Sequence, residues 1–144
     1  MRPMCVVCTT VGPRALEQTD AALARFWALH DRIPEVVCLQ TGIAVAEIVA
    51  NIVEHGRHPR LGRQAERIEI WVAVRADHVR VVVADDGAAA DVDVKIVGLP
   101  DDVLAERGRG LAMAKRLCDE LTYERRDGWN HWTMTSKPFP SIPR

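Results

Sequence analysis

The stretch from Glu35 to His55 constrains the fold more than any other part of the chain. Pro34 precedes it, the acidic Glu35 suits the first turn of a helix, and Gly56 is a typical stop. Most of its residues are apolar or small, so such a helix is largely buried and needs neighbours on most sides. At about 100° per residue, the polar exceptions after Val36, apart from Thr41, fall in one stripe about 100° wide. The members of this stripe are Gln40, Glu47, Asn51, Glu54 and His55.

The polar stripe faces either water or a binding site. It has no Lys or Arg, the usual solvating residues, and it contains Asn, a poor helix former. Glu47 and Asn51 are four residues apart and stand one above the other. Asn supplies a hard oxygen ligand of the kind that Mg²⁺ accepts, and Glu can take a proton from an attacking hydroxyl. An ordinary solvent-facing stripe is the alternative.

Alternation of apolar residues and turn signals predict the remaining elements. We expect strands over 6–10, 68–74, 79–83, 121–125 and 129–136, and further helices over 15–31 and from Gly110 onward. Asp127-Gly128 is a hairpin signal, and the irregular stretch 88–107 has the length of a lid. Together these elements predict an α+β fold, a two-layer α/β sandwich. Its sheet is mixed but mostly antiparallel, with helices on one face.

Asp85-Asp86-Gly87 lies where a predicted strand ends and the chain turns. A carboxylate there can accept a hydrogen bond from an exocyclic amine such as that of adenine. Gly87 permits a flat ligand to approach the backbone closely. A plain turn is an equally favoured interpretation.

Gly108-Arg109-Gly110 opens the last predicted helix. Helix N-termini bind phosphate through their free N–H groups and the helix dipole. The glycines allow a phosphate to come close, and Arg107 or Arg109 can reach a terminal phosphoryl group. An ordinary helix start is again equally favoured.

Length and composition limit the classes of protein. The 144 residues fit one domain over 1–137, with a proline-rich flexible tail over 138–144. A net charge of −1 without a basic patch argues against nucleic acid as a partner. No apolar run approaches the ~18–20 residues of a membrane helix, and the first ten residues do not resemble a signal peptide. We therefore expect a cytoplasmic protein that does not bind a membrane.

Cys5 and Cys8 form a lone Cys-x-x-Cys pair within a β-branched run. A zinc site needs further ligands and a redox motif should open a helix, so we expect an edge strand with small thiols. This strand either ends the sheet of one chain or pairs across a homodimer edge. Neither alternative is favoured.

The order of these motifs is more specific than any one of them. A helix with Glu-x-x-x-Asn, a hairpin ending in Asp-x-Gly, a lid-length loop and a Gly-x-Gly helix start follow one another, and a strand closes the chain. This order resembles the ATP-binding superfamily of gyrase, histidine kinases and the MutL proteins, whose fold is the Bergerat type. The short length and the leading strand and helix are similar to the anti-sigma-factor serine kinases. The resemblance spans residues 6–136 and is most specific over 46–56.

The resemblance implies roles for several residues. Glu47 would be the general base that activates a serine of the partner, and Asn51 would hold Mg²⁺. Asp85 would bind the adenine amine of ATP, Gly87 would line the base pocket, and Thr133 would help to bind the adenine.

Other residues would lie around the phosphates. By the same resemblance they are Gly108, Arg109, Gly110 and Leu111, with Arg107 and His55 approaching. Three positions depart from the family pattern, because Ala89, Ala112 and Trp132 stand where glycine is common. These side chains put lid motion and turnover in question, but not binding.

The resemblance implies an ATP-dependent serine protein kinase and anti-sigma-factor-type regulator that phosphorylates an antagonist protein in a partner-switching pathway. A sigma factor or another regulator would be a second partner. A nucleotide-gated binding module with little or no kinase activity is the alternative, which Ala89 and Ala112 slightly favour. A histidine-kinase fragment is less favoured, because the chain has no room for a dimerising helix pair with a phospho-accepting histidine.

Overall fold

The computed structural model describes residues 2–55, 57–58, 63–64, 66–90, 93–95, 97 and 109–141. Five strands form one sheet, in which each described pair of neighbours is antiparallel. Their spatial order is β1 (Met4–Thr10), β4 (Arg67–Val74), β5 (Val79–Asp85), β7 (Trp129–Ser136) and β6 (Cys118–Arg126). A second, two-stranded sheet pairs β2 (Arg57–His58) with β3 (Arg63–Gln64), where no strand was expected.

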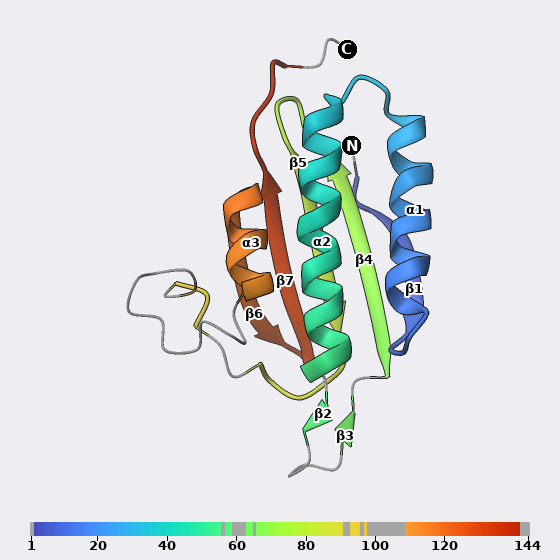
Figure 1. Cartoon of the computed structure of the whole chain (residues 1–144), viewed down its shortest axis with the longest axis vertical. Coiled ribbons are helices and arrows are strands. Elements are labelled where there is room, and N and C mark those ends of the chain that lie inside the picture. The colour runs from blue at the N-terminus through green and yellow to red at the C-terminus, as the bar shows by residue number, and fades with distance from the viewer. Residues whose placement is uncertain are drawn as a thin grey trace.

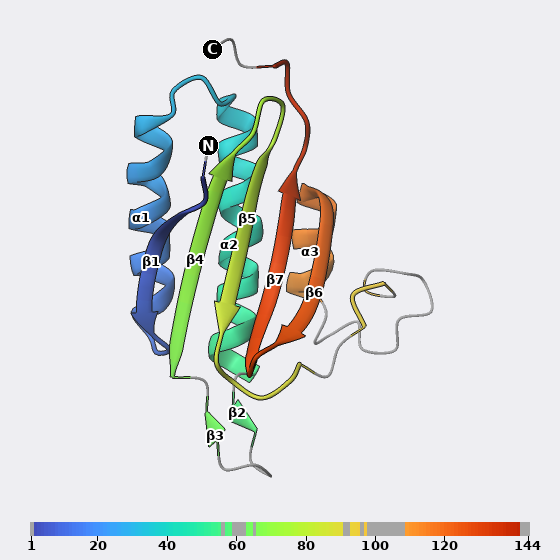
Figure 2. The same ribbon diagram turned by 180° about the vertical axis from the view of Figure 1, so that it is seen from behind.

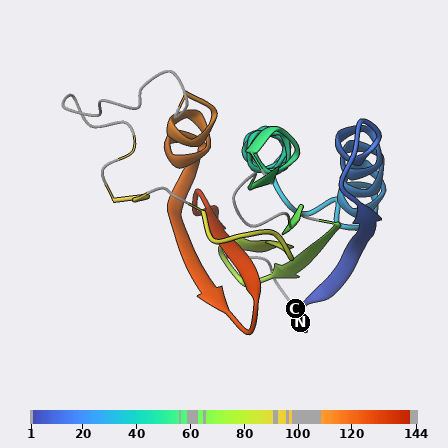
Figure 3. The same cartoon turned by 90° about the horizontal axis from the view of Figure 1, so that it is seen from below.

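Three helices lie on one face of the large sheet, as seen from the front and from below (Figure 1, Figure 3). They are α1 (Ala15–Leu29), α2 (Glu35–His55) and α3 (Arg109–Leu117). Figure 2 shows the opposite face of the sheet, which none of the described helices covers. The expected two-layer α+β sandwich is confirmed, although the described strand pairs of the large sheet are all antiparallel, whereas a mixed sheet was expected.

The core lies between the sheet and α2. Alternate residues of β4 and β5 point toward the helices and are fully buried, among them Ile70 and Val81, and α2 meets them with Val45 and Ile48. By length and composition α2 is apolar enough to span a membrane, so the expectation that no such stretch exists was wrong. In this fold its buried side chains belong to the hydrophobic core, and a core helix passes the same test of length and hydropathy.

Turn chemistry fixes the β6–β7 hairpin. Asp127 and Gly128 have φ values of 54° and 82°, the left-handed conformation that an Asp-Gly hairpin turn requires. The register then pairs Arg126 with Trp129 and holds as far as the pair of Glu120 with Thr135, beyond which it shifts.

Several boundaries differ from the sequence prediction by one to three residues, and two of the differences concern the C-terminal part of the chain. Helix α3 ends at Leu117 and β6 already begins at Cys118, three residues before the expected strand. The tail is not free from residue 138, because the Phe139 N–H donates to the carbonyl of Asp77 at 2.8 Å and its ring is buried. Burial of an aromatic ring stabilises this contact despite the neighbouring prolines.

Strand β1 lies at the edge of the sheet, as expected. A bulge at Val6 shifts its register, so that Cys5 and Cys8 pair with Trp71 and Glu69 and share the open face. Both thiols are free and exposed. Among the described residues no cluster of three metal-ligating side chains occurs. Pairing of β1 across a dimer edge stays a prediction.

Candidate functional site

Three elements bring the predicted motifs to one end of the molecule. Helix α2 and strand β5 both end there, and α3 begins there (Figure 1). Asn51 is in the last two turns of α2, Asp85 is the last residue of β5, and Gly110 is in the first turn of α3. The topology therefore assembles residues that are up to about sixty positions apart in the sequence.

Asp85 is buried at the end of β5, with 3% of its surface exposed. Its Oδ1 accepts hydrogen bonds from the Gly87 N–H at 2.9 Å and from Asn130 Nδ2 at 3.0 Å. Burial raises the pKa of the Asp85 carboxyl above its usual range; these two hydrogen bonds and Arg125 oppose the rise, and Asp86 adds to it. Within the described part of the chain, Oδ2 receives no hydrogen bond, so it remains an acceptor for a ligand amine.

Asp86 has a structural role. Its Oδ1 accepts hydrogen bonds from the N–H groups of Glu66 and Arg67, at 2.7 and 3.0 Å, at the start of β4. The two adjacent carboxylates therefore divide their roles, and only Asp85 belongs to the site.

Asn130 links Asp85 to the beginning of the lid-length stretch. Besides Asp85, its Nδ2 donates to the carbonyl of Ala88 at 2.8 Å. Its Oδ1 accepts from the hydroxyl of Tyr123 and from Arg125 Nη1. The side chain is 2% exposed, so both ends of a buried amide are satisfied and held in one orientation. The sequence prediction missed Asn130, although its place in the same period-two strand as Thr133 was a usable signal.

Thr133 does not join this group. It pairs with Val82, whereas Asp85 pairs with Asn130. Positions 82 and 85 of a strand point to opposite faces, so the side chain of Thr133 lies on the open face of the sheet. The strand register therefore contradicts the expected contact of Thr133 with the base. Asn130 occupies the corresponding place beside Asp85.

Glu47 lies against the first turn of α3. A Cβ placed on Gly110 would overlap Oε2 of Glu47 and would lie 3.5 Å from its Cδ. Glycine at this position therefore leaves room for the carboxylate beside the helix N-terminus. Asn51 stands one turn further along the same face of α2 and is half-buried. The structure thus brings Glu47 and Gly110 together, with Asn51 on the same face of α2 as Glu47.

Several other predicted phosphate contacts are only partly described. Leu111 is 2% exposed and anchors α3 in the core, and Arg109 is exposed at the helix start. Arg107, Gly108 and the side chain of His55 lie outside the described residues.

A contact that the sequence prediction missed joins α3 to the lid-length stretch. Lys115 Nζ donates to the carbonyls of Val94, Lys95 and Val97, at 2.9, 3.2 and 3.2 Å. An ammonium group has three donors and can satisfy three carbonyls at once. The described turn of this stretch is therefore fastened to α3.

The three departures from the glycine pattern have different surroundings. Ala89 is exposed and Ala112 is half-buried in α3. Trp132 is 1% exposed and packs against Tyr123, with ring centroids 4.7 Å apart. Its Nε1 has no hydrogen-bond acceptor among the described residues. Trp132 therefore adds a large aromatic surface next to Asn130 on the helix-facing side.

These residues fit an adenine nucleotide with magnesium. Asp85 has a carboxylate oxygen that no described residue occupies, Gly110 leaves a space beside Glu47, and Asn51 carries an amide oxygen suited to a hard cation. Glu47, Asn51 and Asp85 lie where the roles that the sequence indicated for them require. Those roles stay predictions.

Comparisons with known proteins identify the family. Residues 10–136 match the model of the histidine kinase-like ATPase domain. The serine/threonine-protein kinase BtrW of Bordetella bronchiseptica is 32% identical over 130 residues, which cover 85% of this chain and 89% of that protein.

A solved structure agrees in fold. The structure of the RsbU and RsbW domains of a Mycobacterium tuberculosis protein matches 99% of this chain with a TM-score of 0.64 and 22% identity. The chain spans about a third (34%) of that longer protein. As its motif order indicated, the chain belongs to the histidine kinase-like ATPase domain family, among the relatives of the anti-sigma-factor type of serine kinase.

Proposed function

We propose that the protein is a magnesium-dependent serine protein kinase that uses ATP to phosphorylate an antagonist protein in a partner-switching pathway. The observation that carries the proposal is the carboxylate of Glu47 beside Gly110 in the first turn of α3. Free N–H groups at a helix start attract phosphate. A carboxylate beside them stands where a terminal phosphoryl group and an attacking hydroxyl would meet. The name of the relative BtrW, a serine/threonine-protein kinase, supports the same class of activity.

Each residue has one task in the proposed reaction. Glu47 accepts the proton of the partner's serine while the serine oxygen bonds to the γ-phosphorus of ATP, and the bond from that phosphorus to ADP breaks. Asp85 selects the base by accepting a hydrogen bond from the adenine amine through Oδ2. Asn51 would hold Mg²⁺, which neutralises phosphate charge when bound.

Exchange of Glu47 for glutamine tests the proposal. Glu47→Gln keeps the size of the side chain and removes the base, so transfer of label from ATP to a purified candidate antagonist should fall by about 100-fold or more. ATP affinity, measured by calorimetry, should stay near that of the wild type. Glu120→Gln on the open face of β6 is the matched control and should transfer normally. Undiminished transfer by Glu47→Gln would remove Glu47 from the reaction.

A second candidate function is a nucleotide-gated binding module without catalysis. The contacts of Asn130 with Ala88 and of Lys115 with Val94 favour it, since they join the lid-length stretch to the residue beside Asp85 and to α3. This candidate predicts that the wild type binds ATP and a partner but transfers no phosphate. Equal partner affinity with and without ATP would count against it.

Location and assembly also belong to the proposal. A kinase that draws on ATP and carries four free cysteines in its described part suits the cytoplasm, where thiols stay reduced. A homodimer through the β1 edge is tested by sedimentation. Only monomer at high concentration would remove it.

A further inference from the structure

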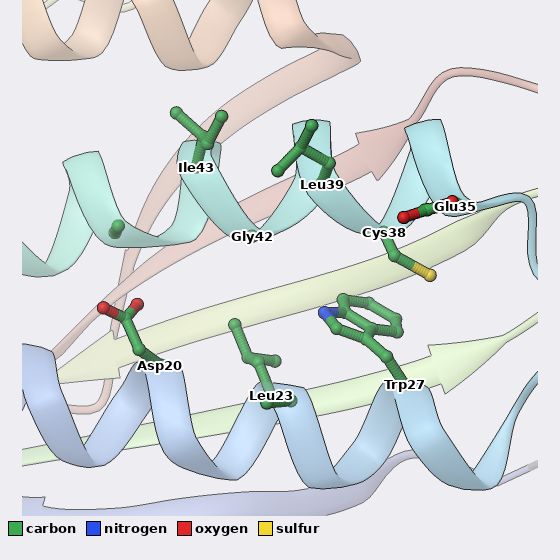
Figure 4. A pocket seen from close by; sticks show the side chains of 10 residues that line it. Asp20, Leu23, Trp27, Glu35, Cys38, Leu39, Gly42 and Ile43 are labelled. Carbon is green, nitrogen blue, oxygen red and sulfur yellow. The ribbon is translucent and has the colours of Figure 1, made fainter.

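An open groove runs between α1 and α2 and has the strands behind it (Figure 4). Apolar side chains of both helices form its walls, chiefly Leu23 and Trp27 from α1 and Leu39 and Ile43 from α2. Gly42 of α2 faces α1, with room for a Cβ that would approach Trp27 Nε1 only to 4.0 Å. The groove is on the opposite side of α2 from α3, so it is separate from the site around Glu47.

The α2 wall of the groove is unusually exposed for a core helix. Leu39 and Ile43 line the groove and are 62% and 38% exposed, and Val36, three residues before Leu39 and outside the lining, is 57% exposed. Their spacing of three and four residues forms one ridge along the helix, the arrangement by which helices dock in grooves. The sequence predicted burial at these positions, because only the polar stripe was expected to leave the core. A contiguous exposed apolar ridge of this kind marks a docking surface.

Acidic residues stand at both ends of the groove. Figure 4 shows Asp20 at one end and Glu35 at the other. Because α1 and α2 are antiparallel, Asp20 lies at the end of the groove where Ala46 is the last lining residue of α2. The eleven-residue step from Glu35 to Ala46 corresponds to about 16 Å, or about three turns of helix. Among the described residues that line the groove, none is Lys or Arg.

This charge pattern distinguishes two possible occupants of the groove, a second copy of this chain and a helix of another protein. In a two-fold pairing of this groove with itself, Glu35 of one copy would face Asp20 of the other, and like charges oppose such pairing. A partner helix with basic residues would instead meet an acidic side chain at each end of the groove. We propose that the groove binds an amphipathic helix of a partner protein, with an apolar face and basic residues about three turns apart.

Two synthetic helical peptides test the proposal on the full chain. They share one leucine face and differ only at two flanking positions three turns apart, which carry Lys in one and Glu in the other. Fluorescence anisotropy of the labelled peptides should show that the Lys peptide binds about tenfold or more tightly than the Glu peptide. The double variant Asp20→Lys with Glu35→Lys should reverse this preference.

Matched variants locate the binding surface. Leu39→Ser should weaken binding of the Lys peptide by about tenfold or more, whereas Leu29→Ser should leave the affinity for this peptide unchanged. Leu29 is the matched control because it is 80% exposed on α1 and does not line the groove. No binding, equal binding of both peptides, or equal effects of the two leucine variants would overturn the proposal.

Self-association has a distinct signature. If sedimentation detects a dimer that Leu39→Ser dissociates, a second copy covers the groove and the partner helix is excluded. ATP calorimetry on the same variants separates this inference from the proposed kinase function. Leu39→Ser should keep the ATP affinity of the wild type, because the groove and the nucleotide site lie on different sides of α2.

Discussion

Replacing Asn130 by alanine should weaken adenine-nucleotide binding through its effect on Asp85. The Asn130 amide donates to Asp85 Oδ1, which is buried, and to the carbonyl of Ala88, which is half-buried. The substitution leaves Asp85 with the Gly87 N–H as its one hydrogen-bond donor among the described residues. The carboxylate then loses both its fixed orientation and part of the stabilisation of its charged form.

The contacts of Asn130 set the expected magnitude. Each buried group left without its partner costs about 1–3 kcal/mol, and the exposed Arg125 can turn to water instead. The buried Asp85 carboxylate, at about 1–3 kcal/mol, and the half-buried Ala88 carbonyl, at about 1 kcal/mol, together predict a decrease in the free energy of unfolding of about 2–4 kcal/mol. Loss of one hydrogen bond to a carboxylate that contacts the base predicts ATP binding about tenfold weaker.

Urea unfolding and ATP calorimetry measure the two effects separately. Thr133→Ala is the matched control, since it lies three residues along the same strand on the open face. It should change the free energy of unfolding by less than about 0.5 kcal/mol and leave ATP affinity unchanged. If Thr133→Ala weakens ATP binding more than Asn130→Ala does, the face assignment of β7 is wrong.

Three further predictions concern other parts of the molecule. Gly110→Ala should displace the Glu47 carboxylate and reduce phosphotransfer by about tenfold or more, while the free energy of unfolding stays equal or rises by up to about 1 kcal/mol; normal transfer would contradict the contact. Because the pKa of Asp85 is raised, ATP affinity should fall as pH decreases through that pKa. The free energy of unfolding has the opposite trend, since the stabilising contribution of Asp85 is present at low pH and is lost as pH rises through the same pKa. Calorimetry over a pH series should show the loss, and an Asp85→Asn variant should lack this pH dependence. Phe139→Ala should lower the free energy of unfolding by about 3 kcal/mol in urea; an unchanged midpoint would mean that the tail does not pack.

Much of the fold follows from local sequence signals. The strong periodicity of α2, with Pro34 before it and Gly56 after it, gave the bounds of that helix without error. The β4–β5 and β6–β7 hairpins followed from alternation and from Asp127-Gly128, because such turns admit few registers. The family was recognisable from motif order, since the order encodes a topology as well as a chemistry.

The missed features depend on contacts between distant segments. Thr133 was placed by a family pattern, but a shift of one residue in a strand moves a side chain to the other face. Asn130 and Lys115 act on segments that are far away in the chain, and nothing local marks such partners. The exposed ridge of α2 was missed because apolar composition predicts burial, whereas a docking surface is apolar and uncovered in the isolated chain.

Calorimetric titration with ATP, with and without Mg²⁺, on the wild type and on Asn51→Ala tests the central claim most directly. The account predicts magnesium-dependent binding by the wild type that Asn51→Ala weakens by about tenfold or more. Gln40→Ala, two turns before Glu47 on the same stripe, should bind as the wild type does. Absence of binding at millimolar ATP, or binding that neither magnesium nor Asn51→Ala alters, would contradict the assignment of this end of the molecule as a magnesium–nucleotide site.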